Sequence, residues 1–241
     1  MSLWYNPYIK GVDIMLVDMK LKRNIKREKV KPNLPRYEET YEEEVLNVIT
    51  HGAGAIFAVV ATILMLVWSN TTKQYVGAIF YGVGFFALYF CSTMYHAQRH
   101  DTSRKKVWRL FDHSTIYLLI GGTYAPILLS SYVGKIGIVL FVIQWVLILI
   151  GITFKFLVPQ KTTVLHVIFC AILGWSGIMV LPTIFSTNIN LFTWILIGGI
   201  IYTLGIAVFA TPKKWSHVIW HFIVLGGSVA HFIGIALYIF H

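Results

Sequence analysis

Residues 136–154 read IGIVLFVIQWVLILIGITF, nineteen positions without a charged side chain. A helix rises about 1.5 Å per residue, so a run of this length matches the hydrocarbon core of a bilayer, which is about 30 Å thick. A segment this apolar is not typical of a water-soluble domain. The run predicts a helix that crosses a membrane.

Apolar runs of similar length occur on both sides of this segment. Hydrophobic residues make up 57% of the chain and charged residues only 12%. The other six runs cover about residues 50–69, 76–95, 112–131, 163–185, 191–210 and 218–240. We therefore predict an all-α polytopic membrane protein, a bundle of seven transmembrane helices.

The positions of Lys and Arg predict how this bundle is oriented. Of the 20 such residues, all but Lys73 and Lys135 fall in the N-terminal arm or in the loops after the second, fourth and sixth runs. Because cytoplasmic loops are enriched in Lys and Arg, we expect a cytoplasmic N-terminus and an external C-terminus. The formal net charge of +10 then reflects topology and attraction to an anionic inner leaflet, and it does not indicate nucleic-acid binding.

Two parts of the chain follow from this pattern. Residues 1–44 are predicted to be a cytoplasmic arm with a basic stretch and then an acidic cluster, and residues 45–241 the transmembrane domain. The basic stretch suits a segment that lies on the inner headgroup surface, and the alternative is a partly disordered arm that only enforces topology.

Ionisable residues gather at the cytoplasmic ends of the predicted helices. His96 ends the second run, Asp112 opens the third, and His217 and His221 open the last. The spacing of four places His217 and His221 on one helix face, as in helices that give two ligands to Zn²⁺. A carboxylate such as Asp112 at membrane depth is a functional hypothesis by default.

Three imidazoles with an open fourth position are typical of a catalytic zinc ion, which makes water a nucleophile near neutral pH. Asp112 then either accepts a proton from that water or coordinates the metal directly. Ser92, one turn from His96, is placed to donate a hydrogen bond to an oxyanion, and the alternative is a hydroxyl bonded to its own helix. Glu44, Asn47 and His51 share one helical stripe at the same end, where they either hydrogen-bond the metal ligands or cap the helix.

Three motifs occur in order along the chain: Glu44-x-x-Asn47-x-x-Thr50-His51, then Ser92-x-x-x-His96 with Phe111-Asp112, then His217-x-x-x-His221 with His231-Phe232. Together they resemble the signature blocks of the hemolysin III proteins, which belong with the progestin and adipoQ receptors and, more distantly, with alkaline ceramidases. The resemblance covers the chain from about residue 42 onward.

The resemblance implies a seven-helix bundle in which zinc is held by His96, His217 and His221, with Asp112 reaching it through water. The receptors typically have a tyrosine after the aspartate, where this chain has His113. This departure leaves the expected metal site intact but separates the chain from the receptors in substrate.

Three functions remain open at this point. The first is a zinc-dependent hydrolase of a lipid amide or ester that enters laterally from the inner leaflet of the plasma membrane. The second is a membrane-homeostasis or lipid-state sensor protein with structural zinc. The third, a pore-forming cytolysin, ranks last because the apolar helices predict a resident membrane protein. Membrane lipids are the expected partners.

Overall fold

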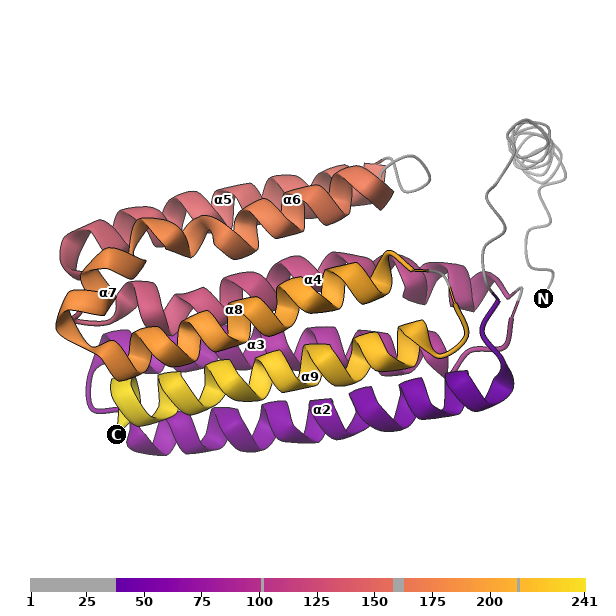
Figure 1. Cartoon of the computed structure of the whole chain (residues 1–241), viewed down its shortest axis with the longest axis horizontal. Helices are drawn as coiled ribbons and strands as arrows, with labels where there is room; N and C mark the ends of the chain where they lie inside the picture. Colours follow the sequence, from indigo (N-terminus) through magenta and orange to yellow (C-terminus); the bar gives the residue numbers. More distant parts are fainter. Residues whose placement is uncertain (1–37, 101, 158–162, 212) are drawn as a thin grey trace, which may run out of the picture. The chain divides into compact units, whose positions relative to one another are not determined.

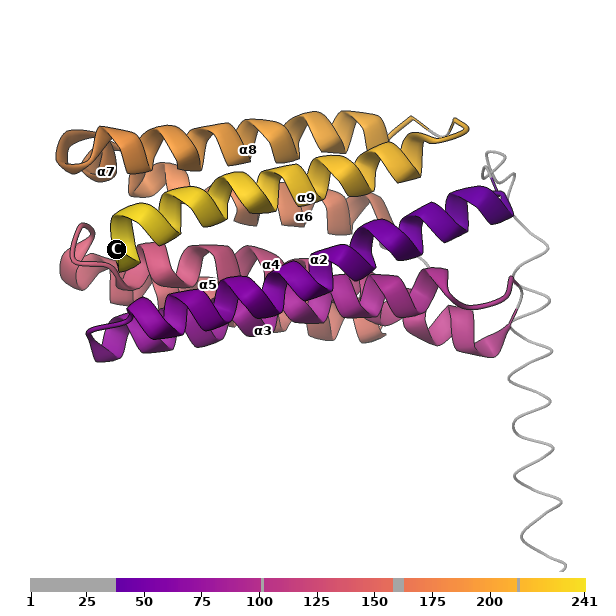
Figure 2. The same ribbon diagram turned by 90° about the horizontal axis from the view of Figure 1, so that it is seen from below.

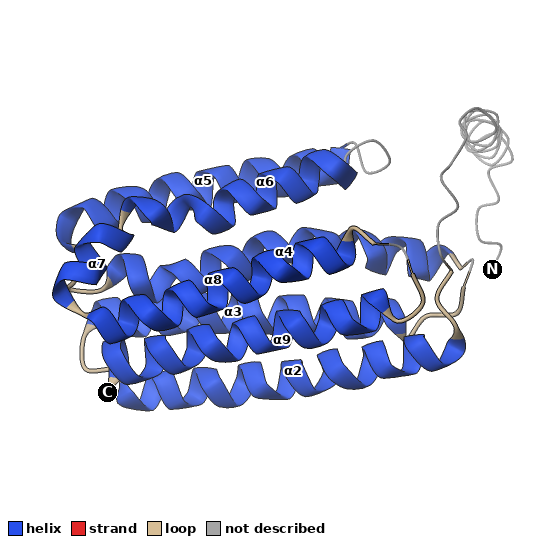
Figure 3. Ribbon diagram, viewed as in Figure 1, coloured by secondary structure: helices blue, strands red, loops and turns tan. Residues whose placement is uncertain are grey.

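The computed structural model describes residues 38–100, 102–157, 163–211 and 213–241, and within these ranges it contains helices, turns and loops but no strand (Figure 3). The predicted all-α class is confirmed. The elements are α2 (Tyr41–Trp68), α3 (Thr72–His96), α4 (Ser103–Leu129), α5 (Gly134–Leu157), α6 (Thr163–Trp175), a 3-10 turn (Ser176–Met179), α7 (Leu181–Thr187), α8 (Ile189–Phe209), α9 (Ser216–Ile235) and a final π-helical turn (Ala236–Phe240).

The long helices lie side by side, with chain neighbours antiparallel (Figures 1 and 2). α3 packs between α2 and α4, and α9 packs against both α8 and α2, so that the first and last described helices meet. The core between them is aromatic, with Tyr81, Phe85 and Tyr89 of α3 fully buried. The start of α2, the end of α3 and the start of α9 therefore lie together at one end of the bundle.

Helix α2 begins nine residues before the apolar run that predicted it. Thr40 and Glu43 form a capping box, in which the Thr40 hydroxyl accepts from the Glu43 amide and the Glu43 carboxylate accepts from the Thr40 amide. This arrangement satisfies amide groups that the first turn leaves unpaired. Glu44, Asn47 and His51 consequently lie well inside a helix.

Helix α4 also begins earlier than expected. The basic segment before Asp112 is helical from Ser103, with Thr102 as its N-cap, rather than a loop as predicted. Lys105 is consequently held in the first turns of α4 and is buried.

The predicted fifth span, residues 163–185, is not one continuous helix. α6 and α7 meet at a bend of 42°. Pro182 has no amide hydrogen and its ring excludes the carbonyl of the residue four before it, which explains why a helix cannot run through. The Tyr124 hydroxyl replaces part of the lost backbone bonding, because it donates to the Gly174 carbonyl and accepts from the Gly177 amide at 3.1 Å.

Five of the described helices, α2, α3, α5, α8 and α9 with its π-helical turn, are long and apolar enough to span a membrane. The bent pair of α6 and α7 is a sixth candidate. The predicted third span corresponds to α4, whose polar residues from Asp112 to Thr115 reduce its hydropathy. Most of the predicted arm, residues 1–37, lies outside the described residues.

Substituting Tyr124 with Phe is expected to destabilise the break between α6 and α7. The substitution leaves two backbone groups without their partner in an apolar setting, at a cost of about 1–3 kcal/mol. Thermal unfolding in detergent should show a lower midpoint for Tyr124→Phe. Tyr75→Phe, which removes a hydroxyl from an exposed tyrosine, serves as the control. Equal midpoints for the two variants would show that Tyr124 does not support the break.

Candidate metal centre

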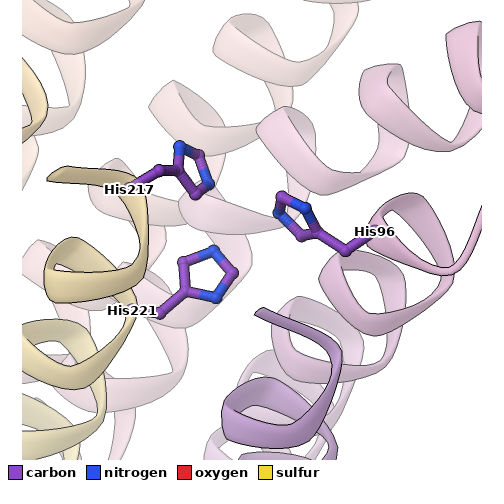
Figure 4. Close-up of side chains that lie close together, drawn as sticks. All are labelled: His96, His217 and His221. Carbon is purple, nitrogen blue, oxygen red and sulfur yellow. The ribbon is translucent and has the colours of Figure 1, made fainter. Parts of the chain in front are cut away.

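Three histidines converge at one end of the bundle. His96 is the last residue of α3, while His217 and His221 lie one turn apart at the start of α9, and their rings face one another (Figure 4). One ring nitrogen from each lies within 4.8 Å of the other two. His96 and His221 are buried, and His217 is partly exposed.

Acceptors near the start of α2 contact the Nδ1 atom of each ring. Glu44 Oε2 lies 2.6 Å from Nδ1 of His96, and Glu39 Oε1 lies 3.3 Å from Nδ1 of His217. Thr50 Oγ1 lies 3.4 Å from Nδ1 of His221 and donates its own hydrogen to a carbonyl one turn back, at 2.8 Å. The two carboxylates can only accept, so they favour a hydrogen on Nδ1 of His96 and His217.

These contacts favour one tautomer of His96 and His217. With the hydrogen on Nδ1, the Nε2 atom holds a lone pair, which is the form in which histidine binds a metal. In the described part of the chain, the Nε2 atom of His96 is buried and has no hydrogen-bond partner. A buried acceptor without a partner is costly unless an ion satisfies it, so the cluster fits a metal ion.

A second group, Glu39, Glu44 and His96, also brings possible ligand atoms within 4.8 Å. Its carboxylates already have other partners, since Glu44 accepts from Lys105 at 2.5 Å and Glu39 accepts from Asn47 at 3.2 Å. The three histidines are the better metal site because their Nε2 atoms are free of such competition.

Glu39 is ionised at neutral pH. Burial opposes ionisation, but the hydrogen bond with His96 and the charges of His217 and Lys105 outweigh it and lower the pKa of Glu39 to about 2. A carboxylate that hydrogen-bonds a histidine raises the basicity of the other ring nitrogen, which strengthens a metal ligand.

His51 lies beside the cluster but makes a different contact from the one expected. Its ring stacks on His221 with centroids 3.5 Å apart and an interplanar angle of 7°. Tyr89 packs edge-on against its other side at 5.1 Å. Neither ring nitrogen of His51 has a hydrogen-bond partner among the described residues. His51 therefore orients His221 by packing.

Asp112 and Ser92 line a cavity of about 180 Å³ together with His217 and His221. The Ser92 hydroxyl is buried and lies within hydrogen-bonding reach of the Asp112 carboxylate. Asp112 is not in the group of ligand atoms within 4.8 Å, and its carboxylate lies 3.5 Å from Nδ1 of the neighbouring His113. The cavity thus places an acid and a hydroxyl side by side next to the histidines.

His231 and His113 are not among the clustered ligand atoms. Nε2 of His231 lies 3.1 Å from the Ile195 carbonyl of α8, a contact between two helices. His113 contacts a carbonyl of its own helix at 2.8 Å.

Sequence reasoning missed three residues that support the site. Glu39 was read only as part of an acidic cluster, and Lys105 as part of a loop. Glu43 accepts a hydrogen bond from the Trp215 amide at 2.5 Å, two residues before His217. The Thr40-x-x-Glu43 capping signature marks where the helix begins, but no sequence signal identifies Lys105 as buried.

Several apolar helices and an interior histidine cluster define a multi-pass membrane protein with a candidate metal site. The profile of the family described as haemolysin-III related matches residues 39–232. Hemolysin-3 of Bacillus cereus is 35% identical over 211 residues, covering 86% of this chain and 96% of that protein. The Hemolysin-3 homolog of Bacillus subtilis is 34% identical over 205 residues, covering 83% and 95%.

The human monocyte to macrophage differentiation factor is 26% identical over 211 residues, covering 85% of this chain and 88% of that protein. The chain belongs to the haemolysin-III-related family, as its three motifs predicted.

Purified protein is expected to contain close to one tightly bound metal ion per chain by elemental analysis. The His96→Ala, His217→Ala double variant should lose it, because two of three ligands are removed. His241→Ala, which removes an exposed histidine at the chain end, is the control. A full metal content in the double variant would contradict the assignment.

Proposed function

We propose that this protein is a zinc-dependent hydrolase of a lipid amide or ester bond, acting at the inner leaflet of the plasma membrane. The observation that supports it most directly is the shared cavity, where Asp112 and Ser92 lie beside two of the three histidines. Three nitrogen ligands with room for a fourth are typical of catalytic zinc.

When bound, zinc supplies Lewis acidity and makes water nucleophilic at neutral pH. His96, His217 and His221 would hold the ion. The Asp112 carboxylate accepts a proton as the water oxygen attacks the carbonyl carbon of the lipid, and it returns that proton to the leaving nitrogen or oxygen. The Ser92 hydroxyl, which lines the same cavity as Asp112, donates to the developing oxyanion.

The cavity wall fits a lipid acyl chain. Away from the histidines it is lined mainly by apolar side chains of four helices, among them Ile127 of α4, Val167 of α6, Leu196 of α8 and Val224 of α9. An apolar tube with polar groups at one end orients a lipid with its scissile bond at those groups. Entry is lateral, from the surrounding bilayer.

The topology that goes with this function has seven spans, with α4 counted as the third and the bent pair of α6 and α7 as the fifth. The N-terminus is cytoplasmic and the C-terminus external. The charge distribution supports this orientation, since the loop before α9 carries Lys213 and Lys214 and the loops at the opposite end carry only Lys73 and Lys135.

A structural role for the metal is the second candidate. The observation that favours it is the tight packing of the cluster, because His221 is only 1% exposed and His51 stacks directly on it. In that case the ion ties α3 to α9 and the protein senses or maintains the state of the membrane without turnover.

Asp112→Asn should separate these two functions. If the metal is catalytic, this variant keeps the ion but loses hydrolysis by a factor of about 10²–10⁴, because the proton acceptor is gone. Ser92→Ala should likewise keep the ion and lose about 10²–10³ in rate. Mass spectrometry of lipids from membranes with and without the protein measures a lysolipid or sphingoid-base product.

Ser114→Ala is the matched control for Ser92→Ala, because the Ser114 hydroxyl is also buried but bonds to its own helix at 2.7 Å. If Asp112→Asn and Ser92→Ala behave as wild type while His217→Ala fails to fold, the metal is structural and the hydrolase proposal is abandoned.

The orientation is tested with two exposed lysines. In a Cys91→Ala, Cys170→Ala background, Lys135→Cys should react with a membrane-impermeant thiol reagent added outside intact cells. Lys214→Cys should react only after the membrane is opened. The reverse pattern would overturn the proposed topology.

A further inference from the structure

A second cavity, of about 240 Å³, lies between α4, α5 and α6 near the ends of these helices that flank residues 158–162. It is lined by Tyr117, Ile150, Gly151, Phe154, Lys155, Leu165, His166 and Phe169. Part of its rim is apolar and faces outward, since Ile150 is 56% exposed and Leu165 54%. We call this cavity the α5–α6 groove.

A buried lysine lines the groove, whose exposed lining is otherwise almost wholly apolar. Lys155, in the last turn of α5, is only 5% exposed. In the part of the chain that the structure describes, its ammonium group takes part in none of the ion pairs or side-chain hydrogen bonds. A buried ammonium group without a counter-charge is costly, so an anion bound beside it would stabilise it.

The groups around Lys155 add donors but no negative charge. His166 contacts the Tyr117 hydroxyl at 2.9 Å, and Tyr117 packs against α5 at Gly151, one turn before Lys155. Arg109 lies close enough for its charge to act on Lys155. Lys155 and Arg109 therefore place positive charge beside the groove.

One carboxylate lies nearby, but it does not line the groove. Asp112 contacts His113, whose ring centroid is 6.0 Å from that of His166. The Asp112 side chain lines the first cavity, with the metal-centre histidines. His166 lines both cavities and so forms part of the wall between them.

We propose that the α5–α6 groove binds the headgroup phosphate of an anionic phospholipid. Lys155 supplies the positive charge, one member of the hydrogen-bonded pair of His166 and Tyr117 supplies a further donor, and the acyl chains lie along Ile150, Phe154 and Leu165. Basic pockets between transmembrane helices are a known form of anionic-lipid site. The outward apolar rim selects a lipid rather than a free anion, because a soluble phosphate gains nothing from it. This site does not depend on hydrolysis at the metal centre.

The test compares lipid retention by native mass spectrometry of the purified full chain. Wild type should retain dioleoyl phosphatidylglycerol in preference to dioleoyl phosphatidylcholine. Lys155→Met should reduce that preference by about fivefold, the effect expected for one basic residue near a phosphate. Lys155→Arg should preserve it. Lys135→Met removes an exposed lysine from the other end of α5 and should leave it unchanged.

Thermal unfolding gives a second measurement that does not depend on transfer into the gas phase. Phosphatidylglycerol should raise the midpoint of wild type and of Lys155→Arg more than phosphatidylcholine does, and this difference should vanish in Lys155→Met. An unchanged preference in Lys155→Met overturns the proposal. Stabilisation by inorganic phosphate equal to that by phosphatidylglycerol also overturns it, because the occupant is then a free anion.

Discussion

The contacts between α2 and the Nδ1 atoms of the three histidines determine the chemistry of this end of the bundle. Without an acceptor at Nδ1, a histidine ring can place its hydrogen on either nitrogen. Glu44 and Glu39 favour the hydrogen on Nδ1 of His96 and His217, which leaves the other ring nitrogen available to a metal. Lys105 in turn neutralises Glu44, so a carboxylate is tolerated in a buried position. Four helices must be in register for these contacts to coexist.

The sequence was sufficient to predict most of the long helices and the clustering of the three histidines, for identifiable physical reasons. Apolar runs longer than a bilayer core have few alternatives to a helix, and a spacing of four puts His217 and His221 on one face. Charge counting then brought His96 to the same end. These arguments use the length of apolar runs, the spacing of residues and the positions of charges, all of which can be read from short stretches of sequence.

The sequence was insufficient wherever a contact joins distant segments. The break between α6 and α7 combines a local signal, Pro182, with a remote one, the Tyr124 hydroxyl from α4. Lys105 was assigned to a loop because the four basic residues near it give the segment the composition of a loop, although α4 already begins at Ser103. The role of Glu39 depends on His217, which lies at the other end of the chain. Hydropathy alone does not identify α4 as a membrane span. Its polar residues Asp112 and His113 lower the hydropathy, and both line the first cavity.

The carboxylate of Glu43 has a consequence for how the protein matures. It caps α2 through the Thr40 amide and also accepts from the Trp215 amide, 172 residues later, where the backbone adopts a left-handed conformation with φ of 68°. Helix α9 is synthesised after all the other described helices, and it carries two of the three histidines. A nascent chain inserted only as far as α8 therefore lacks two of the three clustered histidines and the Trp215 amide that Glu43 binds. The candidate metal site is complete only after α9 has packed against α2.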